Sequence, residues 1–350
     1  MDFKKNLQIS DWEKKYLDLM LSLLAKENLK YSARENMPAT KSKFGEMISI
    51  TNVTSFPILI SKKVNFNNIL AELLWFLNGE TNVKHLIDAG CNIWNEDSYN
   101  FYRKNCVTNN INALSYDDYI SFIKDNDFNT IEKYSNKTFK YNVINNYILG
   151  DCGIQYGKLW RGAYTKGAFQ IDQIEEIINS INFNPESRRH IVSAWNPNTL
   201  SMMALPACHL FYQISCEENT HLDMNVYLRS SDIFLGLPYN ISSYYLLLML
   251  IAKFTNKKAR NLNVMLGDVH IYENLIESCR QQIENAISYN DVENPILNVQ
   301  QVIISDNLRA ENVLDRKIDI STFIAQKHIE LVDYKSLPAI KGKLSTGLVK

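Results

Sequence analysis

Apolar residues recur at helical spacing in several stretches of the chain. The first stretch follows Ser10 and Asp11, either of which can cap a helix, and its apolar positions are Trp12, Tyr16, Leu19, Met20, Leu23 and Leu24. Further helices are expected from about residue 67 to 78 and from 171 to 181. Residues 244–254 are apolar almost throughout, which is typical of a helix buried in a core.

Alternating and short apolar runs predict strands between these helices. Residues 47–53 alternate as a half-buried strand would, and residues 56–60 read as a second extended piece. Strands are also expected at 191–195 and 210–215. The chain therefore mixes helices and strands.

Residues 98–150 differ in composition from the rest of the chain. Asn, Asp and Tyr dominate, and aromatic residues stand at Tyr99, Phe101, Tyr102, Tyr116, Tyr119, Phe122 and Phe128. A disordered linker would carry few aromatic residues. We therefore expect a small folded insertion at about 98–150.

Composition restricts the kinds of partner. The 350 residues, of which 46% are hydrophobic, can bury a sizeable core in one large domain or two ordinary ones. Lys and Arg number 37 against 38 Asp and Glu, so net charge provides no overall attraction to nucleic acid or membrane. An anionic ligand must then be bound by a local cluster.

Cysteine and histidine usage predicts a reduced, cytoplasmic chain without a metal. The six cysteines show no Cys-x-x-Cys spacing, and the six histidines are scattered singly. The first residues lack the apolar run of a signal peptide, and the longest apolar stretch, 244–252, is too short to span a bilayer.

One cysteine has a setting that suggests chemistry. Cys208 precedes by about twenty residues the cluster Arg229-Ser230-Ser231-Asp232. A cysteine in an apolar stretch is usually inert, but a nearby guanidinium would favour the nucleophilic thiolate. His209 is expected to point away from Cys208, because neighbours on a strand face opposite sides.

Seven strings in family order resemble thymidylate synthase. They are Glu72–Asn82, Ile93–Trp94, Gln155–Arg161, Ser187–Pro197, Met203–His209, Tyr227–Ser242 and Gly267–Asn274. Any one short string could arise by chance, but seven in order over nearly the whole chain could not reasonably do so.

The resemblance implies an α+β fold with a mixed, twisted sheet. It also implies a sheet-to-sheet homodimer, in which each chain (1–350) is one domain carrying the inserted subdomain. The implied reaction is the reductive methylation of dUMP to dTMP, with 5,10-methylenetetrahydrofolate as co-substrate and neither a metal nor nucleic acid required.

The resemblance also assigns roles to individual residues. Cys208 would add to C6 of the pyrimidine, and Glu72 would act through water on the uracil carbonyl. The implied catalytic residues are Cys208, Glu72, Tyr156, Arg229 and Asp232. The implied substrate contacts are Arg34, Arg188, Arg189, Gln213, Ser230, Asn240, His270 and Tyr272, with Arg188 and Arg189 reaching into the partner's phosphate site. The implied folate contacts are Trp94, Asp232, Gly236 and Tyr239, and Lys62 stands at a position suited to the folate's glutamate tail.

Without the resemblance, several of these residues have simpler interpretations. Adjacent arginines are more often a solvated surface, Asn240 could be a turn residue after Pro238, and a Glu on a helix usually faces water. His270 and Tyr272 would simply be a polar pair on one face of a strand.

Two departures from the family pattern leave alternatives open. Ala207 stands where the family has proline, and the tail after Ala339-Ile-Lys continues about four residues further than usual. Poor closure by such a tail could admit water, which favours a dUMP hydroxymethylase as the alternative. A third possibility is a non-catalytic homologue that binds a partner through residues 98–150.

Overall fold

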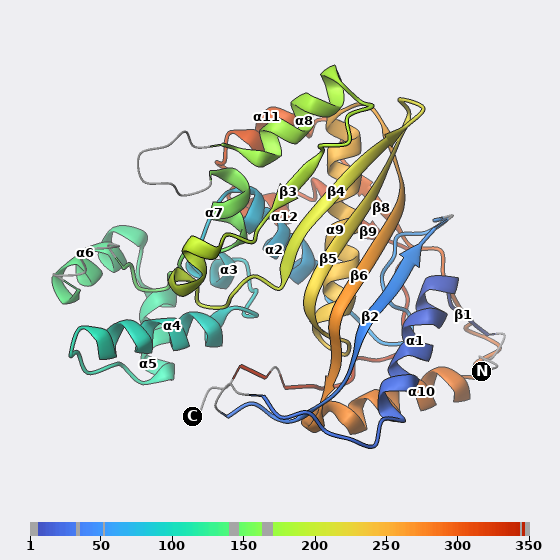
Figure 1. Ribbon diagram of the computed structural model, residues 1–350, viewed down its shortest axis with the longest axis horizontal. Helices are drawn as coiled ribbons and strands as arrows, with labels where there is room; N and C mark the ends of the chain where they lie inside the picture. Colours follow the sequence, from blue (N-terminus) through green and yellow to red (C-terminus); the bar gives the residue numbers. More distant parts are fainter. Residues whose placement is uncertain are drawn as a thin grey trace.

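A mixed five-stranded sheet organises the chain in the computed structural model, which describes residues 6–32, 36–51, 53–139, 147–162, 171–343 and 345–346 (Figure 1). The strand order is β2-β6-β5-β4-β3. The strands are β2 Thr40–Ile50, β3 Ile191–Ser193, β4 His209–Glu217, β5 His221–Asp232 and β6 Lys258–Tyr272. β5 and β6 run parallel and the other neighbours are antiparallel. With its surrounding helices, this sheet makes the fold α+β, as expected.

Helices of very different length surround the sheet. They are α1 Asp11–Leu24, α2 Phe66–Leu77, α3 Lys84–Asp88, α4 Asn95–Thr108, α5 Tyr116–Asp125, α6 Phe128–Thr138, α7 Tyr156–Arg161, α8 Gln173–Phe183, α9 Gly236–Phe254, α10 Ile276–Ser288, α11 Ala310–Leu314 and α12 Ile320–Ala325. Short 3-10 turns span Pro197–Met202 and Glu273–Leu275. Two small sheets pair β1 Leu7–Gln8 with β7 Ile296–Leu297, and β8 Gln301–Ile304 with β9 Ile329–Val332.

One face of the sheet forms the core. Alternate residues of β5, from Leu222 to Leu228, are fully buried there, and α9 packs against β5 and β6 on that side (Figure 1). α9 is apolar almost all round because it is enclosed by the sheet and α2, as the run 244–254 predicted. The helix begins earlier than expected, at Gly236.

The opposite face of the sheet carries an apolar row. Cross-strand register aligns Ser193, Phe211, Tyr227, Met265 and Met47 from β3 to β2. The Met47 side chain is 57% exposed and that of Phe211 is 39% exposed. The helices in the described part of the chain therefore leave this face uncovered.

The prediction of an extended strand at residues 56–60 was wrong. These residues are buried but join no sheet, because other groups take their backbone hydrogen bonds. The amide of Phe56 donates to the carbonyl of Gln300 at 2.8 Å, and the amides of Ile60 and Ser61 donate to the carboxylate of Glu13. A short apolar run cannot distinguish such a segment from a strand.

The residues around the expected insertion are folded. α4, α5 and α6 follow one another there, and aromatic side chains join them (Figure 1). The Tyr102 ring stacks on the Tyr119 ring at 4.8 Å, and the Ser98 hydroxyl lies 2.6 Å from the Tyr119 hydroxyl. The aromatic residues thus form the core of this helical group.

Candidate active site

Cys208 lies immediately before β4 and is held in place by its backbone. Its amide donates to the Tyr156 hydroxyl at 2.7 Å, and its carbonyl accepts from the amide of Arg229 at 2.8 Å. Its side chain is partly exposed, whereas the other cysteines are buried. Burial raises the pKa of Cys91 and of Cys279 to about 12. Cys208 is therefore the thiol that a dissolved substrate can reach.

The Arg229 guanidinium is fixed beside the Cys208 sulfur. Its Nε donates to the Ala207 carbonyl at 2.7 Å, and its Nη2 donates to the Pro206 carbonyl at 2.7 Å. The same Nη2 lies 3.6 Å from Cys208 Sγ. A positive charge at this distance stabilises a thiolate. The arrangement therefore suits a nucleophilic sulfur.

Glu72 is buried in the middle of α2 and does not face water as a glutamate on a helix usually does. Its Oε1 accepts a hydrogen bond from the Trp94 indole nitrogen at 2.7 Å. Burial raises the pKa of Glu72 to about 7, and the bond from Trp94 opposes that shift. A carboxyl group that is half protonated near neutral pH can both give and take a proton.

Tyr156 begins α7 and joins Cys208 to these residues. Its ring lies 6.2 Å from the Trp94 ring and 4.9 Å from that of Phe76. Burial raises the Tyr156 pKa well above its ordinary value, so the phenol stays protonated. Its hydroxyl oxygen accepts the Cys208 amide, which leaves its proton free to be donated elsewhere.

The His209 side chain packs on Tyr156, and the two rings stack at 4.9 Å. β4 begins at His209 and is irregular between His209 and Phe211. Burial lowers the pKa of His209 to about 4, and a hydrogen bond with Asn240 opposes this shift. The neutral imidazole therefore connects Tyr156 to Asn240.

Asp232 ends β5 with one carboxylate oxygen still unpaired. Its Oδ1 accepts from the amides of Phe234 at 2.9 Å and Leu235 at 3.2 Å. Its Oδ2 is buried and has no hydrogen-bond partner among the described residues, and burial raises the pKa of the carboxyl. A buried acceptor of this kind fits a ligand that brings N–H donors, such as the pterin ring of a folate.

Gly236, Tyr239 and Lys62 are further residues that were expected to contact the folate. Gly236 starts α9, and there is room for a Cβ at that position. The Tyr239 hydroxyl accepts from the amide of Asn65 at 3.4 Å. Lys62 is buried, and its ammonium donates to the Phe234 carbonyl. Burial lowers the Lys62 pKa to about 8, and this enclosed position does not favour contact with a glutamate tail in solvent.

The strand residues expected to bind the sugar have a partner that sequence reasoning missed. His270 and Tyr272 share one face of β6, and their rings meet at 4.8 Å. The Nδ1 of His270 lies 3.1 Å from Asp268, whose other oxygen lies 2.5 Å from the Lys30 ammonium. Asp268 in turn is in register with Ser230 on β5. Its position two residues before His270 could have indicated that it shares this face.

The two adjacent arginines that were predicted to bind phosphate lie on the surface of the chain. Arg188 and Arg189 are exposed, and neither guanidinium hydrogen-bonds to a described residue. Gln213 lies nearby on β4, and its amide nitrogen donates to the Arg188 carbonyl at 3.2 Å. Arg34 lies outside the described residues.

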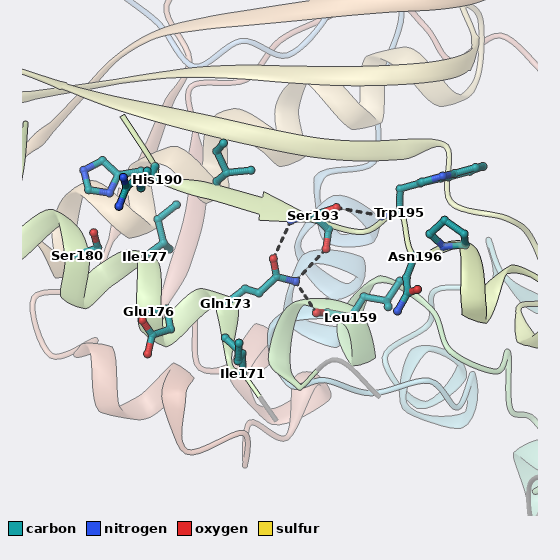
Figure 2. A pocket seen from close by; sticks show the side chains of 13 residues that line it. Leu159, Ile171, Gln173, Glu176, Ile177, Ser180, His190, Ser193, Trp195 and Asn196 are labelled. Carbon is teal, nitrogen blue, oxygen red and sulfur yellow. Dashed lines mark hydrogen bonds between the residues drawn. The ribbon is translucent and has the colours of Figure 1, made fainter. Parts of the chain in front are cut away.

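A cavity of about 500 Å³ lies between α7, α8 and β3 (Figure 2). Figure 2 shows Gln173 reaching across it, where its side chain bonds the Leu159 carbonyl at 2.7 Å and the Ser193 carbonyl at 2.9 Å. Arg189 and Trp195 also line this cavity, but Cys208 does not. The Trp195 ring lies 5.9 Å from the Arg229 guanidinium, so the cavity borders the surroundings of Cys208.

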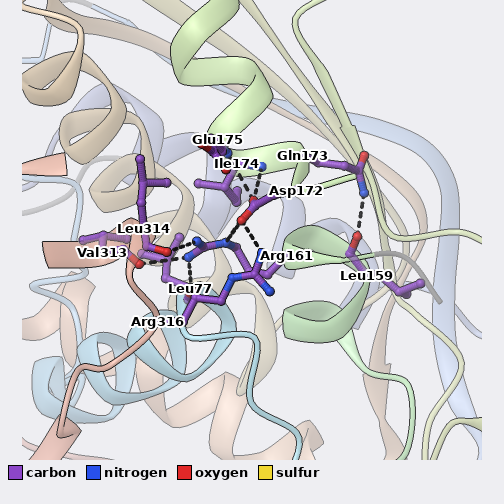
Figure 3. A network of polar contacts seen from close by, with 10 residues as sticks. All are labelled: Leu77, Leu159, Arg161, Asp172, Gln173, Ile174, Glu175, Val313, Leu314 and Arg316. Carbon is purple, nitrogen blue, oxygen red and sulfur yellow. Dashed lines mark hydrogen bonds and ion pairs between the residues drawn. The ribbon is translucent and has the colours of Figure 1, made fainter. Parts of the chain in front are cut away.

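Arg161 holds α2 and α7 together (Figure 3). Its buried guanidinium donates to the carbonyl of Leu77 at the end of α2, to those of Val313 and Leu314, and to the Asp172 carboxylate at 2.9 Å. Gly157 of α7 also packs closely against the chain that follows α2. A Cβ at this position would lie 2.8 Å from the backbone oxygen of Glu80, so the packing requires glycine. This contact sets the positions of the helices that carry Glu72 and Tyr156.

No group of three or more His, Cys, Asp or Glu side chains in the part of the chain described is placed to hold a metal ion. Among the same residues, no helix is long and apolar enough to cross a membrane.

Comparison with known proteins gives a consistent result. The family model described as thymidylate synthase matches residues 14–346. A thymidylate synthase of Mycoplasma mobile is 37% identical over 330 residues, covering 94% of this chain and 99% of the relative. One of Mesoplasma florum is 41% identical over 77% of this chain and 85% of its own length, and one of Staphylococcus haemolyticus is 37% identical over 87% and 90%. The chain therefore belongs to the thymidylate synthase family, whose members are methyltransferases of thymidylate biosynthesis.

Proposed function

We propose that this chain is a homodimeric, cytoplasmic thymidylate synthase that converts dUMP to dTMP with 5,10-methylenetetrahydrofolate through a covalent Cys208 adduct. The observation that carries the proposal is the partly exposed Cys208 sulfur, 3.6 Å from the Arg229 guanidinium and next to the buried Glu72–Trp94–Tyr156 group. Family membership alone would not require these groups to meet. The six free cysteines suit the reducing environment of the cytoplasm.

In the proposed reaction, the Cys208 thiolate attacks C6 of the uracil ring and opens the C5–C6 double bond. The displaced electron pair moves toward the ring carbonyl, where Glu72 supplies a proton through water, while Asn240 pairs with the edge of the base. C5 can then form the new carbon–carbon bond. Tyr156 would act near the departing C5 proton, and breaking the sulfur–C6 bond at the end restores the thiolate.

The folate would provide, when bound, both the one-carbon unit and the hydride. The unpaired buried oxygen of Asp232 is suited to hold the pterin, with Gly236 and Tyr239 beside it and Trp94 shielding the intermediate from water. No metal is needed for this chemistry, because the ring is activated by the sulfur and by proton transfer.

The phosphate of dUMP would be bound jointly by two chains. Arg229 and Ser230 come from the chain that carries Cys208, and Arg188 and Arg189 come from its partner, with Arg34 as a further predicted ligand. His270 and Tyr272 would bind the sugar, and Gln213 would support the base. Exposed arginines without partners among the described residues are consistent with a site completed by another chain.

The exposed apolar row of the sheet supports the homodimer. Phe211 and Tyr227 stack in parallel with ring centroids 6.1 Å apart, and Met265 and Met47 continue the row. A second copy packed on this face would bury the row. In this arrangement, each chain is one domain with residues 98–150 inserted.

The hydroxymethylase alternative is not favoured, because the relatives named above are all thymidylate synthases. The proposal is tested by incubating the protein with dUMP and the folate and measuring the mass of the nucleotide product. We expect dTMP. 5-Hydroxymethyl-dUMP would instead show the alternative reaction, and no product would contradict both. A fluorinated dUMP should give a stable adduct on Cys208 by intact-mass spectrometry.

A further inference from the structure

The imidazole of His270 is held at one ring nitrogen and available at the other. Its Nδ1 lies 3.1 Å from the Asp268 carboxylate, and its Nε2 has no hydrogen-bond partner in the described part of the chain. The His270 side chain is only 8% exposed. Because a buried polar atom normally has a partner, a histidine that is bonded on one side alone is suited to meet a ligand with the other.

The sheet fixes the backbone from which both side chains project. β6 lies between β2 and β5, and His270 is in register with Ser42 on one side and with Asp232 on the other. The His270 carbonyl also accepts from the amide of Ile233 at 3.0 Å. Rotation of the imidazole is therefore the main freedom left to His270, and the bond to Asp268 restricts that rotation.

Asp268 also determines which nitrogen of His270 carries the proton. The hydrogen bond from His270, with a further contribution from the Lys30 ammonium at 2.5 Å, holds the pKa of Asp268 below its ordinary value, although burial opposes the shift. An ionised carboxylate can only accept hydrogen bonds, so Nδ1 must carry the N–H. In the neutral imidazole, Nε2 is then a hydrogen-bond acceptor.

An acceptor at Nε2 fits the sugar of a deoxynucleotide. When the 5′-oxygen carries the phosphate, deoxyribose keeps one hydroxyl, at C3′, and a hydroxyl can donate. We propose that Asp268 is a positioning residue that fixes His270 as the acceptor for this hydroxyl and so makes the site selective for nucleotides whose 3′-hydroxyl is free. The inference rests on the proposed function and extends it, because it names the residue that sets the direction of the sugar hydrogen bond.

The test compares the binding of dUMP and of 2′,3′-dideoxyuridine 5′-monophosphate by equilibrium dialysis without folate. The two nucleotides share base and phosphate, so the ratio of their dissociation constants reports the 3′-hydroxyl alone. For the wild-type protein, we expect roughly tenfold weaker binding of the dideoxy nucleotide, because it leaves the oriented acceptor unpaired. Asp268→Ala and Asp268→Leu remove the carboxylate by truncation and at similar shape, and each should reduce the ratio to about twofold or less.

Two matched variants separate positioning from general stability. Asp268→Asn keeps an oxygen that can accept from His270 Nδ1, and the largely exposed Lys30 can move away from the new amide, so most of the wild-type ratio should remain. Glu330→Ala removes an exposed carboxylate that pairs with Lys327 at 2.7 Å, and the ratio should not change. A general loss of stability would weaken both nucleotides equally and leave their ratio intact.

The possible outcomes distinguish this inference from the proposed function. A wild-type ratio near one, an unchanged ratio in Asp268→Ala and Asp268→Leu, or a ratio for Asp268→Asn as low as theirs would overturn the role of Asp268 and leave the proposed reaction standing. A wild-type protein that binds dUMP but forms no dTMP would contradict the proposed function, and the binding ratios would still decide what Asp268 does. Failure to bind either nucleotide would overturn both.

Discussion

The indole N–H of Trp94 donates a 2.7 Å hydrogen bond to the Glu72 carboxylate and so joins α2 to the start of α4. Trp94 is expected to contact the folate and Glu72 to act on the base. One hydrogen bond therefore connects the two ends of the proposed site. Its strength depends on whether Glu72 is ionised, so its effect can be measured as a function of pH.

Replacing Trp94 by Phe should raise the pKa of Glu72 further. The indole bond stabilises the carboxylate and lowers a pKa that burial has raised to about 7. Without this donor, the protonated form of Glu72 becomes more stable relative to the carboxylate. The limb of the pH–kcat profile that reports Glu72 should therefore move upward by roughly one pH unit. A limb that does not move would show that Glu72 does not produce it.

Glu72→Gln should lower kcat by about two orders of magnitude and also change stability. A buried carboxyl with a raised pKa contributes its full stability below the ordinary value of 4.5, and that contribution is lost as pH rises through about 7. Gln cannot ionise. The difference in unfolding free energy between variant and wild type should therefore shift in favour of Gln, by on the order of 3 kcal/mol, between pH 4 and pH 9. The exposed Glu132→Gln variant should show no such shift in denaturant titrations.

Cys208→Ala should abolish turnover, with a loss of about three orders of magnitude or more, because no other described thiol is exposed.

Arg229→Ala should slow the alkylation of Cys208 by iodoacetamide about tenfold, since the thiolate loses its nearby positive charge. Alkylation is followed by peptide mass spectrometry. Arg280→Ala, on the surface of α10, is the control, and a variant of Arg229 that reacts at the normal rate would remove its proposed role.

Mixing two inactive variants should restore activity if the site is shared between chains. A dimer of one Cys208→Ala chain and one Arg189→Ala chain contains one site with an intact cysteine and an intact arginine. Random exchange of chains should therefore recover about a quarter of wild-type activity. The matched control is Cys208→Ala mixed with Arg229→Ala. This mixture should recover no activity, because the same chain supplies both Cys208 and Arg229 to a given site. Equal recovery in both mixtures would contradict this division of the site.

Met47→Glu should weaken the dimer, because it places a charge at the β2 end of the exposed apolar row. Light scattering after gel filtration should show a larger monomer fraction than in wild type. Met47→Leu keeps the apolar surface and should remain dimeric. A fully dimeric Met47→Glu protein would argue that a different face is buried between chains.

Local pattern was sufficient for several of the helices and strands. α1, α2 and the later part of α9 follow from apolar spacing, because a helix or strand is determined largely by residues close together in the chain. Residues 56–60 were misjudged because their backbone partners, Gln300 and Glu13, are far away in sequence. The same holds for Asp268, whose contact with Lys30 spans most of the chain.

The sequence by itself determined which residue types the chemistry could use, since the cysteine, the arginines and the helix glutamate are ordered as in the family. Only the tertiary structure decided their state: which cysteine is exposed, that Glu72 is paired with Trp94 in a buried setting, and that Asp268 lies between Lys30 and His270. Charge and reactivity depend on burial and on neighbours within a few ångströms. Those neighbours come from segments that only folding brings together.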